Sequence, residues 1–276
     1  MITERLPSRK SKVRRKRRRK QSVRKDREID EETTVKILAL DSSGLVASVA
    51  LLEDDNCIAE YTINYKKTHS QTLLPMLDEV SRMIELDMKT IDAIAVAAGP
   101  GSFTGLRIGS ATAKGIGQAL GKPLIGIPTV DGLAYNLYGT DKVICPLMDA
   151  RRNQTYTGLY EFVKKDNHYE LSVIKEQCAV ALEEIIASIN EIGREVIFLG
   201  DGVPVFRAQL EEQIKVPFTF APASCNRQRA AAVGTLAFSY AKLGKMEEAW
   251  QHNPDYLRLS QAERERKEEQ ERGSDH

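Results

Sequence analysis

Histidine, tryptophan and cysteine are scarce in this chain, and its cysteines are not paired in the sequence. The 276 residues include four histidines, one tryptophan and four cysteines, which lie far apart at Cys57, Cys145, Cys178 and Cys225. This spacing excludes a CxxC-type zinc or redox motif and a disulfide-rich scaffold. No apolar run approaches the roughly 18 residues of a membrane helix, and no apolar core follows the basic N-terminus as in a secretory signal. We therefore expect a cytoplasmic protein with free thiols and no membrane partner.

Positive charge is concentrated at one end of the sequence. Residues 1–27 hold 14 of the 40 lysines and arginines but only two of the 39 acidic residues, which leaves an acidic excess in the remainder. Because residues 1–34 have almost nothing to bury, we expect a basic disordered extension there. Its role stays open between an RNA-binding or targeting arm and an appendage, including a start codon assigned too far upstream. The acidic remainder is a poor nucleic-acid surface, because such affinity comes mainly from clustered cations.

From Val35 onwards the pattern is that of an α/β protein. The stretch "VKILALDSSGLVASVALLED" (35–54) gives a buried strand that ends in an aspartate, a Ser-Ser-Gly turn and a return strand. The strands predicted for this part are 35–40, 46–53, 57–65, 91–99 and 123–128. The helices predicted are 69–87 and 129–138, and a third within 99–121, a stretch that begins with a glycine-rich turn. The order βββαβαβα predicts that residues 35–138 form one actin-like half.

A second round of the same design begins near residue 139. "KVICPLMDARRNQTYTGLYEFV" (142–163) again gives a buried strand that ends in an aspartate, a polar turn and a return strand. The later elements predicted are strands at 169–180, 195–200 and 216–222, and helices at 181–192, 209–214 and 228–245. We assign residues 139–259 to a second actin-like half, with helix 228–245 packing back on the first half. Residues 260–276 are expected to form a charged tail.

Three stretches resemble one known family. "ILALDSS" (37–43), "HSQTLLPMLDEV" (69–80) and above all "VAAGPGSFTGLRIGSATAKGIGQALGKPLIGIPTVDGLA" (96–134) are similar to the TsaB (YeaZ) family, as is "PDYLR" (254–258). The resemblance implies an actin-like ATPase (ASKHA, ribonuclease H-like) fold of two halves. It also implies a part in making N6-threonylcarbamoyladenosine (t6A) at position 37 of tRNA. In that family the protein is a non-catalytic partner of the transferase TsaD, TsaE joins them, and TsaC supplies threonylcarbamoyl-adenylate.

Only one of the two phosphate hairpins of an actin-like ATPase is plausible in the sequence. Such enzymes hold phosphates with backbone amides and small hydroxyls from one hairpin in each half. Asp41 and Ser43 in the first hairpin are candidate contacts for a nucleotide or anion, and Arg107 after the glycine loop is a third. The second hairpin, 149–154, has no glycine and two bulky arginines where the backbone must come close. We expect no cofactor bound by this chain alone, with ATP at most at the interface of a complex.

The sequence also lacks the metal ligands of the related transferase. TsaD carries a His-x-x-x-His pair on the helix that corresponds to 69–86, and two histidines four apart can share an ion. Here His69 is followed four residues later by Leu73. We therefore expect no metal site and interpret His69 as a residue that caps or packs at a helix start.

Two predicted helices carry features of an interface. The helix after the glycine loop has small residues at every fourth position, which allows another helix to approach closely. The preceding helix has more apolar residues than one buried stripe requires. The residues predicted to contact a partner are Leu73, Leu74, Met76, Leu77, Val80, Met83, Gly105, Gly109, Ala113 and Gly117. The alternative is that the small residues pack against the protein's own sheet; the resemblance favours a partner.

Together these features predict a non-catalytic scaffold that binds and activates TsaD as a heterodimer. TsaE would join the larger complex, tRNA would be held mainly by the partner, and the chain alone could form a homodimer. Two alternatives stay open: an autonomous actin-like ATP-dependent phosphotransferase and a direct tRNA-binding module.

Overall fold

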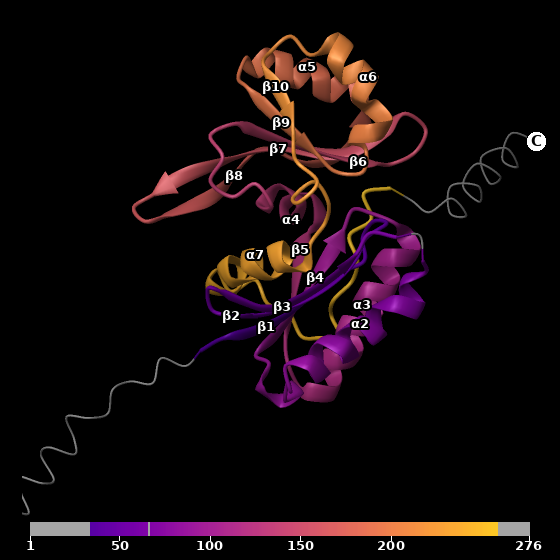
Figure 1. Cartoon of the computed structure of the whole chain (residues 1–276), viewed down its shortest axis with the longest axis vertical. Helices are drawn as coiled ribbons and strands as arrows, with labels where there is room; N and C mark the ends of the chain where they lie inside the picture. The colour runs from indigo at the N-terminus through magenta and orange to yellow at the C-terminus, as the bar shows by residue number, and fades with distance from the viewer. Residues whose placement is uncertain (1–33, 66, 259–276) are drawn as a thin grey trace, which may run out of the picture. The chain divides into compact units, whose positions relative to one another are not determined.

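A computed structural model describes residues 34–65 and 67–258 (Figure 1). The predictions for the basic extension and the charged tail lie outside these residues, apart from Thr34. In the described part, the chain forms two five-stranded mixed sheets with helices packed on their faces. None of the described helices is long and apolar enough to span a membrane.

The first sheet has the strand order β3-β2-β1-β4-β5, in which β1, β2 and β3 are antiparallel and β4 and β5 are parallel to β1. Its strands are β1 (Lys36–Asp41), β2 (Ala47–Glu53), β3 (Asn56–Ile63), β4 (Ala93–Gly99) and β5 (Leu124–Pro128). Strands β1, β2 and β4 are buried over nearly their whole length because helices cover both faces of the sheet.

The helices of this half divide between the two faces of the sheet. Helices α2 (His69–Met83) and α3 (Phe103–Leu120) pack on one face, where Leu73 and Ala113 join a core with Leu40 and Val96. Helix α7 (Ala230–Lys242) packs on the other face, beside α4 (Thr129–Tyr135), and its apolar residues contact those of β1, β2 and β5. A short 3-10 helix, η1 (Met88–Thr90), leads into β4.

The second sheet repeats the design of the first, with the order β10-β9-β6-β7-β8. Strands β6, β7 and β8 are antiparallel, and β9 and β10 run parallel to β6. The elements are β6 (Val143–Asp149), β7 (Gln154–Lys165), β8 (His168–Ala181), α5 (Leu182–Ile192), β9 (Val196–Leu199), α6 (Val203–Gln213) and β10 (Phe218–Phe220). The predicted actin-like fold of two similar halves is confirmed by this topology.

Helix α6 is the element that the sequence prediction placed least well. It begins at Val203, six residues before the predicted start, because Pro204 stands at the first turn, where its missing N–H has no cost. Proline is also frequent in tight turns. The same residue type therefore has opposite meanings at a turn and at a helix start, and only tertiary contacts such as the buried Phe206 distinguish them.

A buried carboxylate joins elements of the two halves. Asp131 on α4 accepts hydrogen bonds from the Tyr160 hydroxyl of β7 at 2.8 Å and from the Tyr240 hydroxyl of α7 at 3.3 Å. Burial is the main cause that raises the pKa of Asp131, while the two tyrosine hydrogen bonds act in the opposite direction. Both oxygens are satisfied, which is the condition for a buried carboxylate to stabilise a fold.

The last described residues, 247–258, run over the first half as a segment that we call the C-terminal strap. Glu247 and Leu124 exchange backbone hydrogen bonds of 2.9 Å, which covers the outer edge of β5. His252 is buried beside Gly126, and its carbonyl oxygen accepts a hydrogen bond from Nζ of Lys114. The strap thus pairs with the edge strand β5 at Leu124 and covers it beside Gly126.

Candidate functional site

The first hairpin uses its aspartate to close its own turn. Asp41 and Ser43 are both buried, and Oδ1 of Asp41 accepts hydrogen bonds from the backbone N–H of Ser43 at 2.9 Å and from its hydroxyl at 2.7 Å. Burial raises the pKa of Asp41, and the hydrogen bonds from Ser43 and the nearby His69 counteract this. The two polar groups predicted to contact a nucleotide therefore contact each other.

Three other segments form hydrogen bonds with the same hairpin. The Ser42 hydroxyl donates to the carbonyl oxygen of Gly105 at 2.8 Å, and the backbone N–H of Ser102 donates to the carbonyl oxygen of Ser43 at 2.6 Å. Nε2 of His69 donates to the carbonyl oxygen of Gly44 at 2.8 Å. The hairpin is thus a junction of α2, α3 and the glycine loop.

The glycine loop forms a tight strand-to-helix turn. Ser102 caps α3, since its side chain accepts a hydrogen bond from the Gly105 N–H, as N-cap serines do. A Cβ at Gly101 would lie 2.2 Å from the carbonyl oxygen of Ser43, so the backbone of the loop is in direct contact with the hairpin.

The second hairpin, residues 149–154, is held by its own aspartate and by the C-terminal strap. Arg151, Arg152 and Asn153 have φ values of 66°, 56° and 56°, the left-handed region that favours glycine. Asp149 accepts a hydrogen bond from the Arg151 N–H at 2.8 Å, and Arg258 of the strap donates to the carbonyl oxygen of Ala150 at 2.8 Å. The strap therefore holds this turn with contacts of the chain itself.

His69 packs at the start of α2, as predicted, and its ring faces the hairpin and Gly105. Among the described residues, no group of three or more histidine, cysteine, aspartate or glutamate side chains could hold a metal ion.

The predicted row of small residues on α3 faces the protein's own sheet. A Cβ at Gly105 would lie 2.1 Å from the carbonyl oxygen of Ser42, and one at Gly109 would lie 2.5 Å from the Ser42 hydroxyl oxygen. At Gly117 a Leu124 methyl carbon would be 2.5 Å away. These spaces are filled from within the chain, which corrects the prediction that Gly105, Gly109, Ala113 and Gly117 contact a partner.

Four of the six residues predicted on α2 are also core residues. Their apolar side chains pack between the helix and the first sheet, and this corrects their assignment to a partner surface; they are Leu73, Met76, Leu77 and Val80. Leu74 and Met83 are 55% and 74% exposed, so for these two the prediction stands.

The exposed side of α3 carries a second set of small residues, which the sequence analysis missed. Ala111 and Gly115 lie one turn apart on this side, and a Cβ at Gly115 would have none of the described atoms within 4 Å. Glycine costs a helix interior about 1 kcal/mol relative to alanine, and no contact in the described chain requires it here. We call Leu74, Ala111 and Gly115 the helix-pair surface, since α2 and α3 lie side by side (Figure 1).

The comparisons with known proteins agree on one family. The chain is 35% identical over 230 residues to the tRNA threonylcarbamoyladenosine biosynthesis protein TsaB of Bacillus subtilis (strain 168), a match that covers 82% of this chain and 96% of that protein. The chain belongs to the TsaB family. The TsaB of Escherichia coli (strain K12) is 32% identical over 130 residues, 46% of this chain and 55% of that protein. YeaZ from Pseudomonas aeruginosa has a similar structure, with a TM-score of 0.67, 26% identity, and coverage of 81% of this chain and 100% of that one.

A family model also matches this TsaB-family chain. The model described as TsaD, tRNA N6-adenosine threonylcarbamoyltransferase, matches residues 56–266. This similarity agrees with the relationship between TsaB and TsaD that the sequence resemblance implies. The matched region includes α2, where this chain has His69 and, four residues later, Leu73.

Arg107 does not join Asp41 and Ser43 in one site of this TsaB-family protein. It lies on the exposed side of α3, with its guanidinium 3.9 Å from the centre of the Phe103 ring and Nε 3.4 Å from the Tyr256 hydroxyl. The hairpin is on the opposite side of the helix. The three predicted nucleotide contacts are therefore divided between a closed turn and an aromatic stack at the surface.

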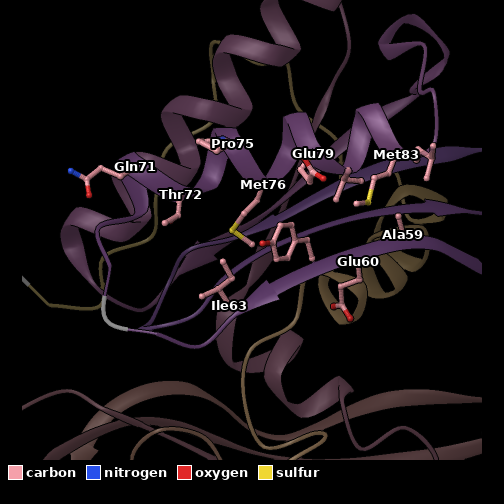
Figure 2. Close-up of a pocket in the computed structure, with 12 residues that line it drawn as sticks. Ala59, Glu60, Ile63, Gln71, Thr72, Pro75, Met76, Glu79 and Met83 are labelled. Atoms are coloured by element: carbon pink, nitrogen blue, oxygen red, sulfur yellow. The ribbon is translucent and has the colours of Figure 1, made fainter.

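Beside α2 there is a groove that the sequence did not reveal. It has a volume of about 620 Å³ and lies between α2 and the edge strand β3 (Figure 2). Tyr61 and Ile63 form its strand wall, and Met76, Glu79 and Met83 its helix wall. In the sequence β3 looked like any half-buried strand, because its place at the edge depends on pairing between distant segments.

Proposed function

We propose that this chain takes part in t6A synthesis as a non-catalytic subunit that binds and activates the transferase TsaD. The observation that carries the proposal is the helix-pair surface of a TsaB-family chain. It combines an exposed leucine with an exposed helix glycine that has no neighbour in the described chain. Small residues allow the axis of a partner helix to come close to that of α3. The exposed leucine beside them would bury apolar surface in the contact.

The hairpins support the non-catalytic part of the proposal. Asp41 accepts hydrogen bonds from Ser43, and Asp149 accepts one from the Arg151 N–H, so the carboxylates of both turns have partners within the chain. Arg258 also holds the second turn through the carbonyl oxygen of Ala150. We propose that the catalytic groups and most of the tRNA contact belong to TsaD, because the chain beyond residue 27 has an acidic excess. TsaE joins the complex, any ATP is held with the partner's help, and the free chain self-associates through the same surface.

The proposal is tested by co-purifying the full chain with TsaD of the same organism. We expect a 1:1 complex for the wild type and its loss for Leu74→Glu and Gly115→Leu, which add a charge or a bulky side chain to the helix-pair surface. Val205→Glu is the matched control, because Val205 is 58% exposed on α6 of the other half, against 55% for Leu74. All three variants should keep the wild-type circular dichroism spectrum.

Activation is measured separately, as t6A formed on tRNA by TsaD with and without this chain. We expect activity to follow complex formation across the variants. A folded wild-type chain that neither binds TsaD nor changes its activity would overturn the proposal.

A further inference from the structure

The two edges of the first sheet are treated differently by the chain. The outer edge of β5 is covered by the C-terminal strap through the paired backbone groups of Leu124 and Glu247. Within the described residues, no strand or strap pairs with the outer edge of β3. Every second residue of such an edge points an N–H and a C=O outward, which is a template for another strand.

Strand β3 also has few of the features by which proteins block an open edge. Over Asn56–Ile63 it contains no proline and no lysine, and its one charged residue is Glu60. The Glu60 carboxylate is turned towards α7, where it accepts hydrogen bonds from Arg229 and from the Ala231 N–H. Figure 2 shows Glu60 pointing away from α2. The open edge is therefore uncharged on its groove side.

The groove beside this edge has the period of a strand. Its lining includes Ala59, Tyr61 and Ile63, which alternate along β3. They pair with Leu51, Val49 and Ala47 of β2, whose side chains share a core with α2, so all three lie on the α2 side of the sheet. Met76 and Met83 oppose them from the helix, and methionine adapts to different side chains. A segment that adds to β3 would direct every second side chain into this groove, which is the pattern of strand addition.

Charge selects the occupant of the groove. Among the described residues that line it, Glu79 is the carboxylate on the helix wall, and there is no lysine, arginine or histidine. Glu79 pairs with Arg82, but that arginine is exposed on α2 and lies outside the lining. Asp55 lies exposed at the turn that begins β3. A second copy of this chain would add its own β3, which contains no lysine or arginine, so it would bring no cation to Glu79. A segment with apolar residues at alternate positions and a lysine or arginine among them fits better.

We propose that TsaD lays an extended segment of this kind along β3, as a sixth strand of the first sheet. This inference rests on the proposed function. The groove and the helix-pair surface share α2, which is only about 10–12 Å across with its side chains, so one partner can reach both. Backbone hydrogen bonds to β3 give affinity, and the groove and Glu79 select the side chains.

The test compares amide hydrogen exchange in the full chain alone and in its complex with TsaD. We expect slower exchange for peptides that contain β3 in the complex. Tyr61→Glu should weaken binding by about tenfold or more, because it puts a charge into the apolar wall. Val173→Glu on β8, the edge strand of the other sheet, is the control; the two residues are 39% and 40% exposed.

The charge argument has its own matched pair. Glu79→Gln should weaken the complex and reduce the dependence of its Kd on salt concentration. Glu211→Gln on α6 should change neither, although Glu211 also pairs with an arginine of its own helix, as Glu79 pairs with Arg82.

The outcomes separate this inference from the proposed function. A complex that Leu74→Glu breaks, with unchanged β3 exchange and wild-type affinity for Tyr61→Glu, overturns the sixth strand and leaves the proposed function intact. Protection of β3 in the chain alone, together with a dimer by light scattering that Tyr61→Glu dissociates, assigns the groove to a second copy and also overturns it. Absence of any wild-type complex overturns both proposals.

Discussion

The backbone N–H of Asp255 donates a 2.7 Å hydrogen bond to the carbonyl oxygen of Ala98 at the end of β4. The carboxylate of the same aspartate accepts a hydrogen bond from Nε2 of Gln177 on β8 at 3.4 Å. One residue of the C-terminal strap is thus bound to a strand of each half. Gly99 makes this approach feasible, since its φ is +124° and a Cβ there would lie 2.1 Å from the Asp255 carbonyl oxygen.

Gly99→Ala is therefore expected to displace the strap. We expect a loss of about 1–3 kcal/mol in the free energy of unfolding, as for other overpacked sites, and faster amide exchange over residues 247–258. Gly121→Ala is the control: φ there is +64°, but a Cβ would have no described atom within 4 Å. It should cost roughly 1–2 kcal/mol from backbone strain and leave exchange in the strap unchanged. Equal strap exchange in both variants would contradict the role of Gly99.

Two glycines of α3 should respond to alanine with opposite signs. Gly109→Ala places a methyl group 2.5 Å from the Ser42 hydroxyl oxygen and should destabilise the fold by about 1–3 kcal/mol. Gly115→Ala meets no described atom and should stabilise it by up to about 1 kcal/mol. Urea unfolding of both variants checks the pair. A destabilised Gly115→Ala would show that this side of α3 is not free.

Asp41→Ala should reduce stability without removing an activity. The change leaves the N–H and the hydroxyl of Ser43 without their buried acceptor, which costs about 1–3 kcal/mol for such a group. ATP hydrolysis by the purified wild-type chain should not exceed that of the variant. Turnover by the wild type that Asp41→Ala abolishes would instead favour the phosphotransferase alternative.

The stability of the chain should depend on the protonation of Asp131. Its pKa is raised by burial, so the folded state keeps the proton to a higher pH than the unfolded state, whose aspartates titrate near about 3.9. The contribution of this group is therefore full below that pH and declines as pH rises through the folded-state pKa. Asp131→Asn cannot titrate and should lose less stability than the wild type between pH 4 and pH 7.

Denaturant unfolding at several pH values measures this difference directly. Asp78→Asn is a suitable control, because Asp78 is exposed on α2 and its replacement should leave the wild-type pH dependence in place. Parallel curves for the wild type and Asp131→Asn would contradict the assignment. A uniform offset between them would report only the loss of hydrogen bonds to Tyr160 and Tyr240.

The fold was predictable from local patterns because both halves repeat the same succession of buried strands and amphipathic helices. The side of α3 that faces inward was harder to determine. A row such as Gly105 and Gly109 looks the same whether it faces the protein's own sheet or another molecule. The partner that decides is Ser42, more than 60 residues away in the sequence. The groove beside Tyr61 depends in the same way on which strand ends the sheet, and no short stretch encodes that.

Where α3 packs on Ser42, both its inner and its outer side carry very small residues. Gly109 on the inner side lacks a side chain, and Ala111, two residues further on and on the outer side, has only a methyl group. Little more than the backbone cylinder, with a Cα radius of about 2.3 Å, therefore separates Ser42 from the outer side at this level. A helix pressed against the outer side would push on a rigid rod rather than on side chains that can change rotamer. Any displacement of the helix would therefore move the first hairpin directly, because Ser42 contacts the helix backbone.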